Sequence, residues 1–121
     1  MPSYPSVVPY LLVKDAPALI EFLKSAFAGN ARMVIPSPTN GVTHAEVEIG
    51  DSLIMLSDAS ELPRAPAHLC LYVKDVDAAY EKSLAAGAVS QSEPKTQDYG
   101  QRMAGITDPA GNTWWLCGET T

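Results

Sequence analysis

The chain has 121 residues, of which 46% are hydrophobic, a composition that favours one folded domain with its own core over a disordered chain. Its formal net charge of −6 disfavours binding to the negatively charged phosphate backbone of nucleic acids, so nucleic acid is not an expected partner. No apolar run reaches the roughly 18 residues that a membrane span needs, and the first residues lack the basic and apolar blocks of a signal peptide. We therefore expect a cytoplasmic protein with no membrane partner.

The first half of the chain predicts the order β-α-β-β-β. Residues 6–13 are mainly apolar with β-branched members, which favours a strand. Asp15 is a typical N-cap, and the residues after it place one apolar helix face at Leu19, Phe22, Leu23, Ala26 and Phe27. Further strands are predicted at 32–35, 44–49 and 53–56.

The second half predicts the same order. A polar connector is expected at 59–65, between a first module at about 6–58 and a second at about 66–118. Asp75 is expected to cap the second helix. Strands are predicted at 68–73, 89–92, 99–107 and 113–117.

An internal repeat supports this duplication. The sequence LLVKD at 11–15 returns as LYVKD at 71–75, sixty positions later, and comparing 11–26 with 71–86 gives seven identities in sixteen. Two copies are too few for a repeat array, so we interpret them as two fused, related modules. A groove between such modules would suit a small ligand.

Two cysteines, Cys70 and Cys117, lie inside apolar runs and do not form a CxxC pair. We expect both to be reduced, buried packing thiols and not a disulfide or a metal pair.

Three segments carry a resemblance to a known family: residues 8–15 with the helix that follows, HAEVEIGDSLIMLSD at 44–58, and YGQRMAGITDPAGNTWWL at 99–116. They resemble the vicinal oxygen chelate superfamily of glyoxalases, bleomycin resistance proteins and dioxygenases, and within it the PhnB-like branch. The resemblance implies an α+β fold, with two tandem βαβββ modules forming a curled, roughly eight-stranded mixed sheet around a cleft. It also implies a homodimer.

The resemblance also implies where a metal site would lie. Metal-using members hold a divalent ion with four His, Glu or Gln side chains, two from the first strands and two from the last strands of the modules. Those positions match Val8, Met55, His68 and Trp115 here. Valine and tryptophan offer no ligand atom, and a thioether suits hard ions poorly. We therefore expect no metal and no other cofactor.

Strand alternation indicates which side chains line the expected cleft. The ligand-binding candidates are Val8, Tyr10, His44, Glu46, Met55, His68, Tyr72, Arg102 and Trp115. No residue is a firm catalytic candidate, and His68 is a weak one.

Alternatives stay open for several of these candidates. His68 is either a core histidine bonded to a neighbour or a proton-transfer group. Trp115 suits either packing or ligand stacking, and His44 and Glu46 suit either a solvated strand face or ligand contacts. Arg102 either clamps an anion or pairs with Glu46 or Glu48.

Three functions are compatible with this pattern. The leading hypothesis is a metal-free protein that binds a small, partly aromatic molecule in the cleft, as bleomycin resistance proteins do, and the acidic charge favours a cationic, antibiotic-like ligand. The first alternative is a glyoxalase-like lyase or isomerase that acts on a small oxygenated substrate through His68, Glu46 or Arg102. The second alternative is a non-catalytic interaction module.

Overall fold

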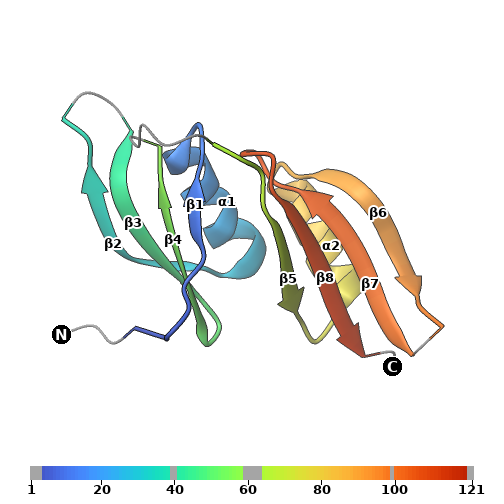
Figure 1. Cartoon of the computed structure of the whole chain (residues 1–121). Helices are drawn as coiled ribbons and strands as arrows, with labels where there is room; N and C mark the ends of the chain where they lie inside the picture. Colours follow the sequence, from blue (N-terminus) through green and yellow to red (C-terminus); the bar gives the residue numbers. More distant parts are fainter. Residues whose placement is uncertain (1–3, 39–40, 59–63, 99, 120–121) are drawn as a thin grey trace. The chain divides into compact units, whose positions relative to one another are not determined.

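The computed structural model describes residues 4–38, 41–58, 64–98 and 100–119 of the chain (Figure 1). The chain divides into two compact units, Met1–Ala65 and Pro66–Thr121. Most of the expected connector at 59–65 lies outside the described residues, as do Thr39, Asn40 and Tyr99 of the expected turns and strands.

The first unit is a four-stranded sheet with one helix. Its elements are β1 (Tyr10–Leu12), α1 (Ala16–Phe27), β2 (Asn30–Pro36), β3 (Val42–Ile49) and β4 (Ser52–Ser57). The strand order is β1-β4-β3-β2, with β1 parallel to β4 and the other pairs antiparallel. The helix packs on one face of this sheet (Figure 1), and the buried side chains between them include Leu11, Leu23, Ala45, Val47 and Leu56.

The second unit repeats this arrangement. Its elements are β5 (His68–Tyr72), α2 (Val76–Ala85), β6 (Val89–Thr96), β7 (Gln101–Thr107) and β8 (Thr113–Glu119). The strand order is β5-β8-β7-β6, again with one parallel pair, β5 with β8. The α+β class and the two βαβββ modules are confirmed, and the eight strands form two four-stranded mixed sheets. The shared cleft stays a prediction.

Both helices begin at the predicted caps. The Asp15 carboxylate accepts the Ala18 backbone N–H at 3.1 Å, and the Asp75 carboxylate accepts the Ala78 N–H at 3.1 Å. Each bond satisfies one of the free amide donors at a helix start, which explains why the repeated motif ends in aspartate. Within the described part of the chain, neither helix combines the length and the apolar character needed to cross a bilayer.

β1 and β6 differ most in length from the predicted strands. β1 begins only at Tyr10, because Pro5 and Pro9 have no N–H for a sheet ladder and Val7 is 83% exposed. β6 continues to Thr96 although its sequence is polar and contains Pro94. It is an edge strand, where a missing donor and polar side chains are tolerated because one side of the strand has no ladder to complete.

Candidate functional site

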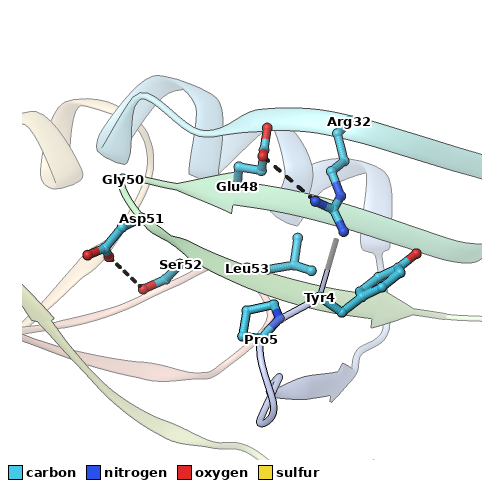
Figure 2. Close-up of a pocket in the computed structure, with 8 residues that line it drawn as sticks. All are labelled: Tyr4, Pro5, Arg32, Glu48, Gly50, Asp51, Ser52 and Leu53. Atoms are coloured by element: carbon cyan, nitrogen blue, oxygen red, sulfur yellow. Dashed lines mark hydrogen bonds and ion pairs between the residues drawn. The ribbon is translucent and has the colours of Figure 1, made fainter. Parts of the chain in front are cut away.

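Each sheet has an open face, which we define as the face opposite its helix. In the first unit, Ala45, Val47 and Ile49 of β3 are buried, and His44, Glu46 and Glu48 alternate with them on the open face. Across the sheet, Met55 pairs with Glu46 on one side and with Tyr10 on the other. Beside the β3–β4 turn this face is hollowed into a pocket of about 390 Å³ (Figure 2).

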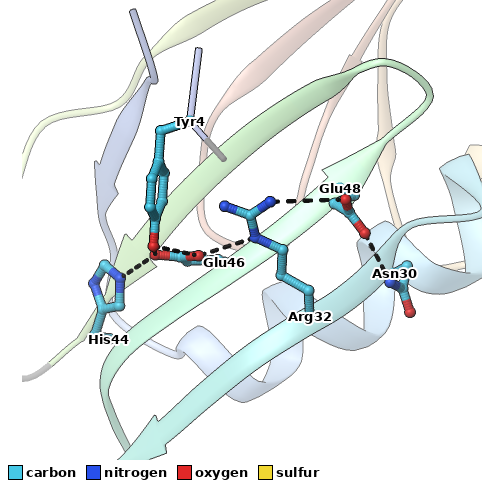
Figure 3. Close-up of polar contacts among 6 residues, drawn as sticks. All are labelled: Tyr4, Asn30, Arg32, His44, Glu46 and Glu48. Carbon is cyan, nitrogen blue, oxygen red and sulfur yellow. Dashed lines mark hydrogen bonds and ion pairs between the residues drawn. The ribbon is translucent and has the colours of Figure 1, made fainter. Parts of the chain in front are cut away.

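The centre of the first open face is a buried carboxylate. Glu46 is only 2% exposed, and Figure 3 shows three side chains that reach its oxygens. The Tyr4 hydroxyl donates to Oε2 at 2.9 Å and the Arg32 Nε–H donates to Oε1 at 3.0 Å. The ring nitrogen Nε2 of His44 lies 3.0 Å from Oε2. The alternative of a solvated strand face is therefore wrong for Glu46.

These contacts fix the charge state of Glu46. The hydrogen bond with His44 lowers the pKa of the Glu46 carboxyl, burial acts in the opposite direction, and the bonds from Tyr4 and Arg32 lower it further. The net effect is a pKa below the usual range. A carboxylate that is this well satisfied stays ionised and is a poor proton acceptor at neutral pH.

Arg32 joins this network to a second carboxylate. Its guanidinium lies over the Tyr4 ring, 4.9 Å from the centroid, and its NH1 is 3.8 Å from Glu48 Oε2 (Figure 3). Asn30 Nδ2 donates to Glu48 Oε1 at 2.9 Å. The Arg32 contact with Tyr4 has the geometry of a cation–π interaction.

Sequence reasoning missed Tyr4, Asn30 and Arg32. The ladder between β2 and β3 shifts its register between Ala31 and Met33, so Arg32 lies in a β-bulge. A bulge re-aims a side chain in a way that alternation does not reveal. Tyr4 is 42 positions from Glu46, and no local pattern links them.

The second open face is aromatic. Trp115 Nε1–H donates to His68 Nδ1 at 3.2 Å, and the two rings are stacked with 6.2 Å between their centroids and 14° between their planes. The Trp115 ring lies against Gly105, where an added Cβ would come within 2.8 Å of it. Tyr72 is 68% exposed. His68 is exposed, so the alternative of a core histidine is wrong, although it does bond to a neighbour.

The neighbouring tryptophan lies on the other face. Trp114 is 2% exposed, and its Nε1–H donates to Asp108 Oδ2 at 2.8 Å. Asp108 also accepts the backbone N–H groups of Ala110 and Asn112, which closes the turn before β8. The two tryptophans therefore have separate environments.

Arg102 is not part of either open face. It shares the alternation of the buried Ala104 and Ile106, and its guanidinium donates to both carboxylate oxygens of Asp77 on α2, at 2.6 and 2.8 Å. The alternative that Arg102 pairs with Glu46 or Glu48 is therefore wrong. The hydrogen bonds from Arg102 lower the pKa of Asp77.

A difference of one position explains the Arg102 error. Glu46 pairs with Met55 and Gly105 pairs with Trp115, so the third strands are 59 positions apart whereas the fourth strands are 60 apart. The first-module equivalent of Arg102 is therefore Thr43, a neighbour of His44 on the opposite face.

The two thiols differ. Cys117 is buried, and burial, with a smaller effect of the neighbouring Cys70, raises the pKa of its thiol. Cys70 is exposed, so the expectation of a buried packing thiol is wrong for it. It alternates with Leu69 and Leu71 and lies on the open face with His68 and Tyr72. Both cysteines are free thiols.

The residues at the family's metal positions do not fit a divalent ion. Val8 and Met55 lie in the first unit, where the Met55 N–H donates to Pro9 O at 2.9 Å, and neither side chain offers an oxygen or nitrogen ligand. In the second unit the Nδ1 lone pair of His68 accepts the Trp115 indole N–H. The described residues contain no group of three His, Cys, Asp or Glu side chains able to hold a metal.

Comparisons with known proteins identify the family. A sequence model of the Glyoxalase/Bleomycin resistance protein/Dioxygenase superfamily matches residues 5–116. "Uncharacterized protein Mb0911c" of Mycobacterium bovis is 31% identical over 124 residues, covering 93% of this chain and 82% of that protein. The crystal structure of TioX from Micromonospora sp. ML1 has a TM-score of 0.77 at 20% identity and covers 97% of this chain and 98% of its own.

A glyoxalase-related enzyme from Fulvimarina pelagi has a TM-score of 0.76 at 16% identity, over 95% of this chain and 88% of that one. At these identities the two solved structures establish the fold alone, whereas the match to residues 5–116 covers nearly the whole sequence. The chain therefore belongs to the Glyoxalase/Bleomycin resistance protein/Dioxygenase superfamily.

Proposed function

We propose that this protein binds a small, partly aromatic, cationic molecule on its open faces and performs no chemistry on it, in the manner of bleomycin resistance proteins. The observation that carries the proposal is the His68–Trp115 stack at positions where metal-using relatives place ligands. An aromatic platform made of the partly buried Trp115 ring and the exposed His68 ring, in a protein with a net charge of −6, favours planar cations. Tyr10 and Tyr72, both more than half exposed, add to the aromatic character of the two faces.

The state of the candidate catalytic groups supports binding over catalysis. A lyase or isomerase would use Glu46, His68 or Arg102. Glu46 already accepts three side-chain bonds, and Arg102 is paired with Asp77 on the helix side of its sheet. His68 alone remains on an open face, with Nδ1 occupied by Trp115. A general acid or base needs a free site for the substrate proton. Two of the three candidate catalytic residues, Glu46 and Arg102, are therefore engaged by other side chains, which disfavours the enzyme hypothesis.

Two further proposals accompany this function. We propose that the protein belongs to the PhnB-like branch and that it is a cytoplasmic homodimer. Light scattering after size exclusion tests the assembly, because a dimer has twice the 12.9 kDa mass of the chain. A mass of one chain at micromolar concentration would contradict it.

The two tryptophans provide a direct test of ligand binding, because the chain contains no others. Trp114→Phe leaves Trp115 as the only indole reporter, and Trp115→Phe leaves the buried Trp114. Proflavine, a planar cation, is titrated into each variant, with anthracene-9-carboxylate as the planar anion. We expect saturable quenching by proflavine in Trp114→Phe and much weaker quenching in Trp115→Phe.

The controls separate binding from other outcomes. Equal quenching of both variants would contradict a platform at Trp115, and tighter binding of the anion would contradict the cationic ligand. Turnover is tested with the hemithioacetal of methylglyoxal and glutathione. Consumption of this substrate that disappears in His68→Ala would replace the binding proposal with the enzyme alternative.

A further inference from the structure

The segment before β1, residues 4–9, is attached to the first unit mainly at its two ends. Five of its six residues are exposed, Val7 the most at 83%. Within the part of the chain that the structure describes, its one backbone hydrogen bond runs from the Met55 N–H to Pro9 O at 2.9 Å, at the end next to β1. The polar contacts at the other end are made by the Tyr4 side chain. Two side-chain contacts therefore offset the ordering of an exposed segment.

Tyr4 lies between a buried carboxylate and a guanidinium. Its hydroxyl is 2.9 Å from Oε2 and 3.2 Å from Oε1 of Glu46, and its ring lies under the guanidinium carbon of Arg32, with 4.9 Å between that carbon and the ring centroid (Figure 3). Glu46 is 2% exposed, whereas Tyr4 is 48% exposed. A buried acceptor thus receives a half-exposed ring from the surface, as a binding site receives a ligand.

The groups that surround Tyr4 are held in place by the sheet. Arg32 Nε and His44 Nε2 both lie 3.0 Å from the Glu46 carboxylate, and these residues come from β2 and β3, which pair with each other. Tyr4 and Arg32 also line the pocket of about 390 Å³ beside the β3–β4 turn (Figure 2). Removal of the tyrosine ring would therefore extend this pocket to the Glu46 carboxylate without removing its other two partners.

The charges around Tyr4 favour a neutral aromatic group that carries a hydrogen-bond donor. The Glu46 carboxylate disfavours an anion at the position of the Tyr4 hydroxyl, and the Arg32 guanidinium disfavours a cationic ring beneath it. A phenol hydroxyl makes a charge-assisted hydrogen bond to a carboxylate, and the face of its ring attracts a guanidinium. Both contacts are the ones that Tyr4 makes.

We propose that Glu46 and Arg32 form a binding site for a phenol, and that Tyr4 is a tethered occupant which a small phenolic ligand displaces. A short flexible tether gives its end an effective concentration of about millimolar, so Tyr4 competes with the ligand and covers the site when no ligand is bound. The site lies within the first unit and takes a neutral group. It is independent of the aromatic platform at Trp115.

The test uses p-cresol, because this phenol reproduces the tyrosine side chain. It is titrated into wild type and Tyr4→Ala, and nitrogen-15 NMR spectra follow the backbone amides of Arg32 and Glu46. The amides of Arg102 and Gly105 in the second unit are internal controls. Tyr4→Ala should bind p-cresol about tenfold more tightly than wild type does, because the tethered competitor is gone.

Ligands of similar shape test the recognition of the phenol in Tyr4→Ala. Toluene lacks the hydroxyl and should bind about tenfold more weakly than p-cresol. The anion 4-methylbenzoate and the cation 4-methylbenzylamine should also bind more weakly. Adding Glu46→Gln should remove most of the difference between p-cresol and toluene, because a neutral amide is a weaker acceptor than a carboxylate.

Tyr72→Ala is the matched control. It makes the same change at a tyrosine of the second unit that is 68% exposed, and it should leave the affinity for p-cresol at the wild-type value. All reporter amides lie in the first unit and Trp115 is intact in every variant, so failure of this inference is distinct from failure of the proposed function.

Four results would overturn the inference. Equal affinity for p-cresol in wild type and Tyr4→Ala, or the same gain in Tyr72→Ala, would show that Tyr4 does not occupy a ligand site. Equal affinity of Tyr4→Ala for p-cresol and toluene would leave an apolar surface without recognition of the hydroxyl. Tighter binding of either charged ligand than of p-cresol would replace the phenol site with an ion site at Arg32 or Glu46.

Discussion

The two modules keep the same face toward their helices and differ on the face opposite them. Tyr10 pairs with Met55 in the first module, and Cys70 pairs with Trp115 sixty positions later, so the ladders correspond. Beside Met55 stands Glu46, the centre of a charged network, whereas beside Trp115 stands Gly105, which leaves room for the indole. Duplication has thus kept the strand pairing while the open faces became charged in one module and aromatic in the other.

The helices show a second difference between the modules. α1 buries six side chains, Ala16, Leu19, Ile20, Phe22, Leu23 and Ala26, whereas α2 buries Val76, Tyr80 and Ser83. In the alignment of the two repeats Leu23 corresponds to Ser83, and both side chains are 0% exposed. The first module therefore has more apolar surface under its helix, which stabilises it more strongly.

The largest expected effect tests this difference. Leu23→Ala removes a fully buried side chain and should lower the free energy of unfolding by about 2–5 kcal/mol. Ser83→Ala changes the equivalent residue and should cost less than about 1 kcal/mol, because the serine hydroxyl donates to the Ala79 carbonyl of its own helix, one turn earlier, at 2.7 Å. Urea denaturation followed by circular dichroism measures both. Similar losses of unfolding free energy in Leu23→Ala and Ser83→Ala would contradict the larger apolar core of the first module.

The next effect tests the aromatic open face. Gly105→Ala places a Cβ within 2.8 Å of the Trp115 ring, so the indole must move and the free energy of unfolding should fall by about 1–3 kcal/mol. The intrinsic fluorescence of Trp115 in a Trp114→Phe background should change with it. Ser92→Ala, an exposed neighbour that pairs with Gly105, is the control and should have little effect.

A double variant isolates the contact. In a Trp115→Ala background the added methyl group of Gly105→Ala meets no indole, so its cost should largely disappear. An undiminished cost would mean that Gly105 is required for another reason, since its added Cβ would also lie 3.3 Å from the Gln91 side chain.

Most of the fold was predictable because it depends on local pattern. Apolar spacing with an aspartate cap located α1, a second aspartate cap located α2, and the distribution of apolar residues located β3, β4, β5 and β8. The sixty-residue repeat correctly aligned the first and last strands of the modules.

The candidate site was less predictable because it depends on irregularities. The one-residue difference between β3 and β7 moved Arg102 to the helix side of its sheet, and the bulge at Arg32 turned a guanidinium toward Glu46. Tyr4 reaches Glu46 from 42 positions away, through a segment with no periodic pattern. Each of these contacts requires the folded backbone before it can be recognised.

The smallest expected effect concerns stability at acid pH. Its test compares the buried carboxylate of Glu46 with the exposed carboxylate of Asp77. The hydrogen bond with His44, together with those from Tyr4 and Arg32, holds the folded pKa of Glu46 below its usual value of about 4.5. A group with a depressed folded pKa contributes stability above its unfolded pKa and loses it as the pH falls through the folded pKa. Wild type should therefore lose stability below about pH 4.5 more steeply than Glu46→Gln does.

Asp77 is the matched case in the second module, because hydrogen bonds from Arg102 also lower its pKa. Its side chain is 55% exposed, so solvent screens the pair, and Asp77→Asn should change the acid limb less than Glu46→Gln. Urea midpoints measured between pH 3 and pH 7 test the order of the two variants. If Asp77→Asn had the larger effect, the exposed pair on the helix side would control acid stability, and the charged network of the first open face would be incidental to it.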